Sequence, residues 1–247
     1  MDQLFKDCVE KGLGEIGISL DQMQMEQFYR YYELLIEWNK VMNLTAITEL
    51  EDVVVKHFMD SISLVNGIKK LPEISAAVID VGTGAGFPGI PLKIAFPGLS
   101  VTLLDSLNKR VNFLNEVIGQ LGLERIEAVH GRAEDLGRDQ KYREKYDFCV
   151  SRAVANVSTL AEYCLPFVKV GGYFIPYKSG KIDEELEMGK GALRVLGGEM
   201  EDVVKFQLAG GSMERSFVMV RKVKGTPGRF PRKAGVPSKE PLRRWWE

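Results

Sequence analysis

Histidine and cysteine, the side chains that most often hold transition metals, are scarce in this sequence. Only two histidines, His57 and His130, occur in 247 residues, and they lie far apart along the chain. The cysteines form no Cys-x-x-Cys pair and sit among apolar neighbours, as buried thiols usually do; they are Cys8, Cys149 and Cys164. We therefore expect neither a zinc site nor a disulfide framework, and no metal at the functional site.

Long apolar runs are also missing. No stretch approaches the roughly 18 apolar residues of a membrane-spanning helix. The first residues, Met-Asp-Gln-Leu-Phe-Lys-Asp, lack the basic and then apolar segments of a targeting signal. An apolar content of 45% is nevertheless enough for a sizeable core. The sequence predicts a cytoplasmic protein without a membrane partner, and we expect a monomer.

Charge is nearly balanced over the whole chain, at −1, but it is unevenly distributed. Residues 1–75 carry thirteen Asp or Glu against seven Lys or Arg, whereas residues 221–247 carry two against nine. On charge alone, a basic tail of this kind is most simply a solubilising terminus. Binding of an anionic partner such as a nucleic acid is the alternative.

The hydrophobic pattern changes near residue 75. Before it, apolar residues recur at helical spacing, as at Met25, Phe28 and Leu35, and Asp21 supplies a helix N-cap. Residues 1–75 are therefore predicted to form a helical region. After it, short β-branched runs alternate with amphipathic stretches, which predicts strands over 77–81, 101–105, 125–130, 146–151, 173–177, 202–208 and 216–223.

The order of these elements predicts an α/β fold. Helices between the first five strands make the sheet mostly parallel. The turn Gly210-Gly211-Ser212 makes the last two strands a hairpin at the sheet edge, which adds one antiparallel strand. The expected domains are a helical region over 1–75, a seven-stranded core over 76–223 and a basic tail over 224–247.

Four glycines fall within eight residues between the first predicted strand and the next helix, in Asp-Val-Gly-Thr-Gly-Ala-Gly-Phe-Pro-Gly. A strand, a glycine loop and a helix hold a nucleotide in doubly wound sheets, and we expect this backbone to approach a cofactor. The dinucleotide pattern Gly-x-Gly-x-x-Gly fits only in a late register that contains a proline. Gly-x-Gly-x-Gly fits from Gly82 through Gly84 and Gly86, and is typical of S-adenosylmethionine-dependent methyltransferases.

Polar residues follow the next three strands. Asp105, at the end of the second strand, can accept hydrogen bonds from ribose hydroxyls, but NAD enzymes share this feature. The stretch Gly-Arg-Ala-Glu-Asp from Gly131 lies where methyltransferases commonly read adenine, with a surface turn as the alternative. The stretch Ser-Arg-Ala-Val-Ala-Asn from Ser151 lies where substrate should enter, and contains neither an Asn/Asp-Pro-Pro-aromatic motif nor a Pro-Cys pair. Methylation of exocyclic amines and of cytosine C5 is therefore disfavoured.

These motifs, in this order, closely resemble the RsmG (GidB, glucose-inhibited division protein B) family of bacterial 16S rRNA methyltransferases. The resemblance runs from about Tyr32 to Leu242. It rests on W-N-K-V-M-N-L-T-A-I from Trp38, H-F-M-D-S from His57, D-V-G-T-G-A-G-F-P-G-I-P-L from Asp80, D-S-L-N-K-R from Asp105, G-R-A-E from Gly131, S-R-A-V-A from Ser151 and P-R-K-A-G-V-P-S-K-E-P-L from Pro231. The final Arg-Arg-Trp-Trp-Glu departs from the pattern.

The resemblance implies a Rossmann-like class I methyltransferase fold and methyl transfer from S-adenosylmethionine to N7 of one guanine in 16S rRNA, with S-adenosylhomocysteine as product. The implied partner is 16S rRNA or the small ribosomal subunit. Cofactor contacts are carried over to Gly82, Phe87, Ala133, Glu134 and Arg152. The loop pattern adds Gly84 and Gly86, and the general fold adds Asp105 and Ser106. Arg152 is expected beside the methionine carboxylate or an RNA phosphate.

Guanine N7 has a lone pair in the ring plane and no proton to lose, so direct in-line transfer needs no general base, and we name no catalytic residue. In this context the basic tail is interpreted as an RNA contact through Arg232, Lys233, Lys239, Arg243 and Arg244, with Trp245 and Trp246 available for stacking on bases. Trp38 is expected to dock the helical region onto the core.

Three other classes compete. An NAD-dependent oxidoreductase would need a dinucleotide loop in the right register. A methyltransferase of small molecules or proteins would leave the tail unexplained. An RNA-binding protein without catalysis is disfavoured by the intact Asp80, glycine loop and Asp105.

Overall fold

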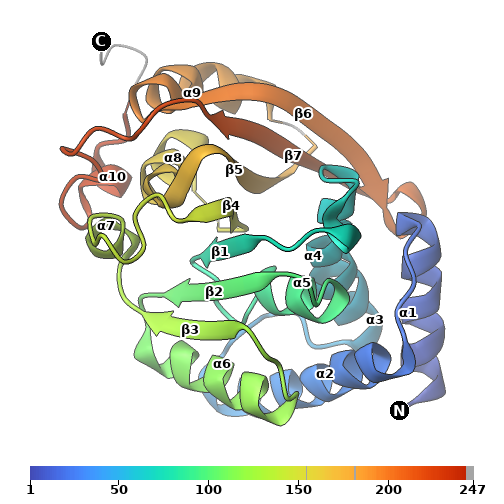
Figure 1. Ribbon diagram of the computed structural model, residues 1–247. Helices are drawn as coiled ribbons and strands as arrows, with labels where there is room; N and C mark the ends of the chain where they lie inside the picture. Colours follow the sequence, from blue (N-terminus) through green and yellow to red (C-terminus); the bar gives the residue numbers. More distant parts are fainter. Residues whose placement is uncertain (154, 181, 243–247) are drawn as a thin grey trace.

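The computed structural model describes residues 1–153, 155–180 and 182–242. One seven-stranded sheet runs through the molecule in the order β3-β2-β1-β4-β5-β7-β6 (Figure 1). The neighbours among β3, β2, β1, β4 and β5 all pair in parallel, and β7 is antiparallel to both of its neighbours, β5 and β6. The strands are β1 Ala77–Val81, β2 Ser100–Asp105, β3 Ile126–His130, β4 Tyr146–Ser151, β5 Val168–Ser179, β6 Gly198–Leu208 and β7 Met213–Lys222.

All seven predicted strands and the single antiparallel strand are confirmed. Three strands begin three to five residues earlier than the pattern indicated, β5 at Val168, β6 at Gly198 and β7 at Met213. In β5 the register against β4 shifts between Tyr146 and Phe148, so the first residues of the strand, which include two glycines, are joined to the rest by an irregular step. Apolar alternation cannot detect such a segment because it breaks the period of two.

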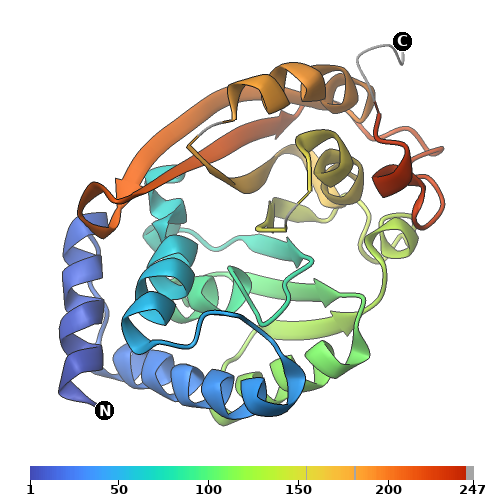
Figure 2. The ribbon, with the colours of Figure 1, turned by 180° about the vertical axis from the view of Figure 1, so that it is seen from behind.

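Helices cover both faces of the sheet. The N-terminal region lies on the same face as α5 Gly89–Ala95 and α6 Asn108–Gln120 (Figure 1 and Figure 2). It contains α1 Gln3–Ile16, α2 Gln22–Met42, α3 Leu50–Val53, a π-helix η1 Val54–Met59, α4 Asp60–Ile62, η2 Ser63–Asn66 and η3 Leu71–Glu73. The opposite face carries α7 Ala133–Leu136, α8 Val157–Cys164, η4 Leu165–Phe167, α9 Asp183–Val195 and α10 Val236–Lys239; the turn η5 Ala209–Gly211 joins β6 to β7.

Two hydrophobic cores result, one on each face of the sheet. Val78, Leu103 and Ile175 point into the core beneath the N-terminal helices. Ile79, Leu104 and Phe174, each one residue away, point into the core beneath α8 and α9. Side chains alternate along a strand, so a parallel sheet that is covered on both faces needs nearly continuous apolar runs.

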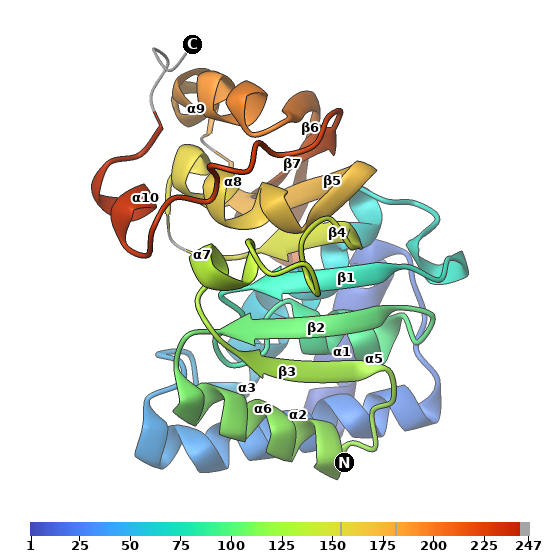
Figure 3. The same ribbon diagram turned by 60° about the vertical axis from the view of Figure 1, so that its left-hand side comes forward.

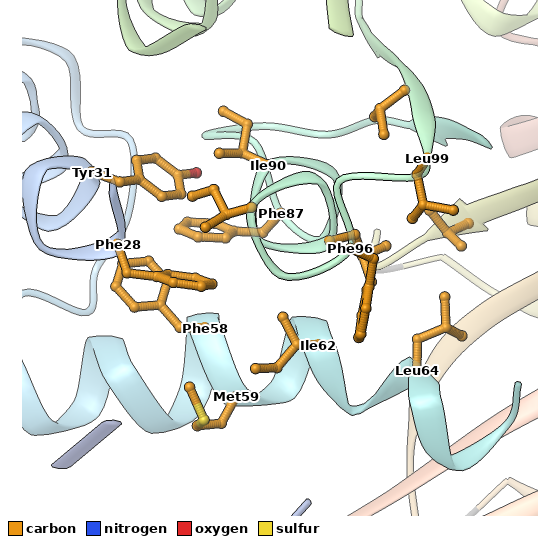
Figure 4. Close-up of a cluster of buried hydrophobic side chains, with 14 of the residues drawn as sticks. Phe28, Tyr31, Phe58, Met59, Ile62, Leu64, Phe87, Ile90, Phe96 and Leu99 are labelled. Atoms are coloured by element: carbon orange, nitrogen blue, oxygen red, sulfur yellow. The ribbon is translucent and has the colours of Figure 1, made fainter. Parts of the chain in front are cut away.

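Helix α2 fixes the N-terminal region to the sheet. Its N-cap Asp21 and Gln24 exchange side-chain and backbone hydrogen bonds, and these form a capping box. Phe28 and Tyr31 on its buried stripe pack with Phe58 and Phe87, as Figure 4 shows. Trp38 packs on Phe113 of α6, with ring centroids 5.6 Å apart, which agrees with its predicted docking role.

The basic tail lies against the second core through residue 242. Phe230 and Leu242 are buried there. Arg143 donates from Nη1 and Nη2 to the carbonyl oxygens of Phe230 and Thr226, at 2.9 and 2.6 Å. Figure 3 shows the tail and α10 beside α7, near the ends of β1 to β3. The predicted RNA contacts Arg243 and Arg244, and the tryptophans Trp245 and Trp246, lie outside the described residues.

Across the described ranges, no helix combines the length and the apolar character that crossing a membrane requires.

Candidate active site

A cleft of about 470 Å³ lies at the carboxyl ends of β1, β2 and β3, which is within the usual range for a small-molecule site. It is the place at which doubly wound sheets bind nucleotides. Five predicted cofactor residues line it: Gly82, Asp105, Ser106, Ala133 and Glu134. Four others, Gly84, Gly86, Phe87 and Arg152, are not part of its lining.

Asp105 is held rigidly at the end of β2. Its Oδ1 accepts a hydrogen bond from the Leu107 N–H at 2.9 Å, and its Oδ2 accepts one from the Gly84 N–H at 2.9 Å. Arg110 Nη1 lies 3.4 Å from Oδ2. A carboxylate offers about four acceptor positions, so this anchored group keeps acceptor capacity for hydroxyl groups in the cleft.

The tail closes one wall of the cleft. Glu134 of α7 accepts a hydrogen bond at Oε1 from the Gly235 N–H, at 2.9 Å, and Gly235 itself lines the cleft. Leu160 and Tyr163 of α8 complete this wall. Sequence reasoning missed these three lining residues. A lone glycine in a basic tail and an apolar pair on a buried helix carry no local signal of ligand binding.

The glycine loop has two different surroundings. Gly82, Gly84 and Gly86 all have positive φ, at 73°, 63° and 102°, a conformation in which glycine is favoured. Gly82 lines the cleft, but a Cβ on Gly86 would lie 2.6 Å from Ile90 Cδ1 and 2.7 Å from the Tyr31 hydroxyl oxygen. At Gly86 the backbone therefore makes room for α2 and α5, and its predicted approach to a cofactor stays a prediction.

Tyr31 connects the N-terminal region to this loop. Its hydroxyl is buried and donates a hydrogen bond to the Ala85 carbonyl oxygen at 2.5 Å. Figure 4 shows the Tyr31 ring beside Phe87 and Ile90. The helical region is thus part of the support of the loop.

Asp80 supports the loop from beneath. Its Oδ2 accepts hydrogen bonds from Thr83 Oγ1 at 2.6 Å and from the Gly89 N–H at 2.8 Å. Its Oδ1 is buried and has no hydrogen-bond partner within the described residues. Burial raises the pKa of Asp80 to about 7, because desolvation disfavours the carboxylate.

Arg152 and Phe87 lie together outside the lining of the cofactor cleft. The Arg152 guanidinium lies 5.1 Å from the centroid of the Phe87 ring. It donates from Nη1 to Asp60 Oδ2 at 3.0 Å and to the Lys56 carbonyl oxygen at 2.9 Å. In contrast, Ala153 and Ala155 of the same segment line the cofactor cleft.

His57 links these groups, stacking on Phe87 with ring centroids 4.4 Å apart. Its Nδ1 lies 3.0 Å from Arg152 Nη2, and its Nε2 lies 2.9 Å from Thr45 Oγ1. Because a guanidinium can only donate, Nδ1 must accept, and the ring proton sits on Nε2. Burial and the positive charge of Arg152 lower the pKa of His57 to about 3, so the ring is neutral at ordinary pH.

Arg232, a predicted RNA contact, is engaged inside the protein. Its Nε and Nη2 donate to Oε1 and Oε2 of Glu162, at 2.9 and 2.7 Å, and the Glu162 side chain is only 1% exposed. The geometry gives this guanidinium a structural role in attaching the tail to α8. Lys233 and Lys239, in contrast, are exposed on either side of Gly235.

The strand order, the glycine loop after β1 and the carboxylate at the end of β2 define a class I S-adenosylmethionine-dependent methyltransferase fold. The fold is similar to that of Methanococcus jannaschii TYW2 in complex with AdoMet (TM-score 0.50, 16% identity, covering 64% of this chain and 74% of that chain). It is also similar to the M. jannaschii fibrillarin pre-rRNA processing protein (TM-score 0.51, 18% identity, covering 67% and 76%).

Sequence comparisons identify the family. Residues 24–217 match the GidB model, rRNA small subunit methyltransferase G. The ribosomal RNA small subunit methyltransferase G of Lachnoclostridium phytofermentans is 57% identical over 232 residues, which cover 94% of this chain and 95% of the relative. That of Alkaliphilus oremlandii is 50% identical over 238 residues, covering 96% and 99%. The chain belongs to the rRNA small subunit methyltransferase G family, and its cofactor is S-adenosylmethionine.

Proposed function

We propose that this protein transfers the methyl group of S-adenosylmethionine to N7 of one guanine in 16S rRNA. Membership of the family supports an rRNA substrate. The observation that carries the choice of atom is the composition of the cleft, whose described lining contains no histidine, cysteine or lysine. Its two carboxylates, Asp105 and Glu134, both accept hydrogen bonds from backbone N–H groups. The cleft is therefore suited to an acceptor atom that has no proton to lose.

S-adenosylmethionine supplies an electrophilic methyl group on a positively charged sulfur. Guanine N7 would accept this methyl group through its lone pair as the carbon–sulfur bond breaks, and the transfer would need no proton to be removed. The protein then contributes mainly by alignment, which can account for about 7 to 11 kcal/mol of a barrier. In this proposal the rigidly anchored groups of the cleft serve to align the reactants.

In this proposal the cleft residues hold the cofactor. Asp105 accepts hydrogen bonds from the ribose hydroxyls, and Ala133 and Glu134 contact the adenine. Gly82 and Ser106 complete the cofactor site. The residues outside the lining, which are Gly84, Gly86, Phe87 and Arg152, keep the loop and the segment after β4 in position.

We propose that the exposed lysines of the tail contact RNA phosphates beside the cleft. Lys233 and Lys239 are exposed and flank Gly235, which lines the cleft, so both lie beside the cofactor site. Arg232 is left out of this set, because its charge is paired with the buried Glu162.

The test is a reaction of purified protein, labelled S-adenosylmethionine and 16S rRNA from cells that lack an enzyme of this family. We expect incorporation at one guanine, where reduction and aniline treatment cleave the chain next to N7-methylguanosine. An Asp105→Ala variant serves as the control and should lose incorporation. Absence of incorporation by the parent protein, or methylation at another atom, would refute the proposal.

A further inference from the structure

A second pocket, of about 360 Å³, lies between the N-terminal region and the strands β5 and β7. Its lining brings together four cationic side chains from four separate segments of the chain, and one carboxylate, Asp60. The cations are Lys56 of η1, Arg152 after β4, Lys178 of β5 and Arg215 of β7.

Asp60 fixes two of these cations without neutralising both. Its side chain is 4% exposed; Oδ1 accepts a hydrogen bond from Arg215 Nε at 2.7 Å, and Oδ2 accepts one from Arg152 Nη1 at 3.0 Å. Two guanidinium groups thus share a single carboxylate, and the pocket keeps an excess of positive charge. Groups that are held in this way lose little side-chain entropy when they bind an anion.

The other two cations differ in how firmly they are held. Lys178 Nζ donates to the Ala155 carbonyl oxygen at 2.6 Å and to Glu185 Oε1 at 2.7 Å. Lys56 stands at the rim, where it pairs with the exposed Asp52 at 2.8 Å, and such a pair contributes little and is easily exchanged for another anion. Lys56 belongs to a π-helical turn, a feature that often marks functional sites.

The neutral His57 sets the direction of Arg152. Because His57 Nδ1 must accept from Arg152 Nη2, the ring adds a constraint on the guanidinium but no charge. The hydrogen bond from His57 Nε2 to Thr45 Oγ1 connects this constraint to the Trp38 motif. Two stretches that define the resemblance, W-N-K-V-M-N-L-T-A-I and H-F-M-D-S, therefore meet at this pocket.

The pocket is separated from the cofactor cleft by one stretch of backbone. Arg152 lines the pocket, while Ala153 and Ala155 line the cleft. An anion in the pocket would sit beside the place where a base meets the methyl group. We propose that this pocket binds a phosphate group of the RNA backbone next to the target guanine. The proposal rests on the proposed rRNA methylation and adds the site that holds the strand.

The decisive variant is Arg215→Gln, with Arg221→Gln as its matched control. Both arginines lie on β7, but Arg221 is exposed outside the pocket and is 4.0 Å from Glu201. With a 16S rRNA transcript, we expect Arg215→Gln to weaken binding about tenfold and to reduce the slope of log affinity against log salt by about 0.7 to 0.9. Arg221→Gln should match the parent in both measurements.

A second variant guards against misfolding, since Arg215 also bonds the buried Asp60. Lys56→Gln changes an exposed rim side chain and should lower RNA affinity and salt slope in the same direction. For all variants the affinity for S-adenosylmethionine, measured by calorimetry, should remain that of the parent.

Two results would overturn the inference while leaving the methylation proposal intact. The first is equal RNA affinity for the two arginine variants, together with an unchanged Lys56→Gln protein. The second is a loss of S-adenosylmethionine affinity in Arg215→Gln with RNA affinity retained, which would make the pocket a receptor for the cofactor's carboxylate. If the parent protein does not methylate 16S rRNA, the proposed function itself fails and the inference fails with it.

Discussion

Alanine at Gly84 and at Gly86 should separate backbone strain from crowding within one loop. At Gly84, φ is +63° and an added Cβ would have no heavy atom within 4 Å. Gly84→Ala should therefore be destabilised only by the cost of the left-handed conformation, about 1 to 2 kcal/mol. At Gly86, φ is +102° and the Cβ would lie 2.6 Å from Ile90 Cδ1 and 2.7 Å from the Tyr31 hydroxyl oxygen. Overpacking then adds about 1 to 3 kcal/mol, for a total of roughly 2 to 5 kcal/mol.

The assay is urea unfolding of the cofactor-free protein, followed by circular dichroism. Gly86→Ala should unfold at a clearly lower urea concentration than Gly84→Ala, with a similar dependence of the free energy of unfolding on urea concentration. Because the Tyr31 hydroxyl is one of the crowded atoms, Tyr31→Phe should recover part of the loss in the Gly86→Ala background, a non-additive result. Equal destabilisation by the two alanines, or strict additivity with Tyr31→Phe, would refute the packing that we describe for Gly86.

Three further predictions concern other parts of the site. Tyr31→Phe and Tyr177→Phe each remove a buried hydroxyl that donates to a backbone carbonyl. Urea unfolding should show a loss of about 1 to 3 kcal/mol of stability for both. Calorimetry should show weaker S-adenosylmethionine binding for Tyr31→Phe alone. Arg232→Gln leaves the buried Glu162 carboxylate without its cation and should lower the free energy of unfolding by about 3 kcal/mol, whereas the exposed Lys233→Gln should change it little. The raised pKa of Asp80 means that the folded protein keeps a proton that the unfolded chain releases, so stability falls as pH rises from about 4 to about 7. Asp80→Asn should remove this pH dependence. Between pH 5 and pH 6.5, measured by urea unfolding, the free energy of unfolding of the parent should fall relative to that of the variant by up to about 1.4 kcal/mol per pH unit, the limit for one proton. Identical pH dependence in parent and variant would contradict the assigned proton.

Elements with a regular apolar period could be predicted from the sequence. The five parallel strands and the edge hairpin follow from β-branched runs and turn residues, and all seven strands occur, although β5, β6 and β7 begin three to five residues earlier than expected. The stripe of α2 was predicted through Phe28 and Leu35, although its most consequential member, Tyr31, was missed because its partner is a carbonyl group far along the chain. Local periodicity reports burial, not the identity of a long-range partner.

The site was predictable where each residue acts from the end of a strand. Asp105, Ser106, Ala133 and Glu134 follow β2 and β3, and the parallel topology brings them into one cleft. The division between Arg152 and Ala153 was not predictable, because two successive residues point into different pockets. The ion pair of Arg232 with Glu162 also lay beyond sequence reasoning, since the charge of the tail says nothing about which cation finds a buried carboxylate.

The most direct test of the account is a map of N7-methylguanosine in 16S rRNA from a bacterium whose own enzyme of this family has been deleted. The deletion should leave one guanine unmethylated, and expression of this protein should restore that single modification, whereas the Asp105→Ala variant should not. Restoration by the Asp105→Ala variant at the parental level would contradict the assigned cofactor cleft. A map that the parent protein leaves unchanged would contradict the proposed function.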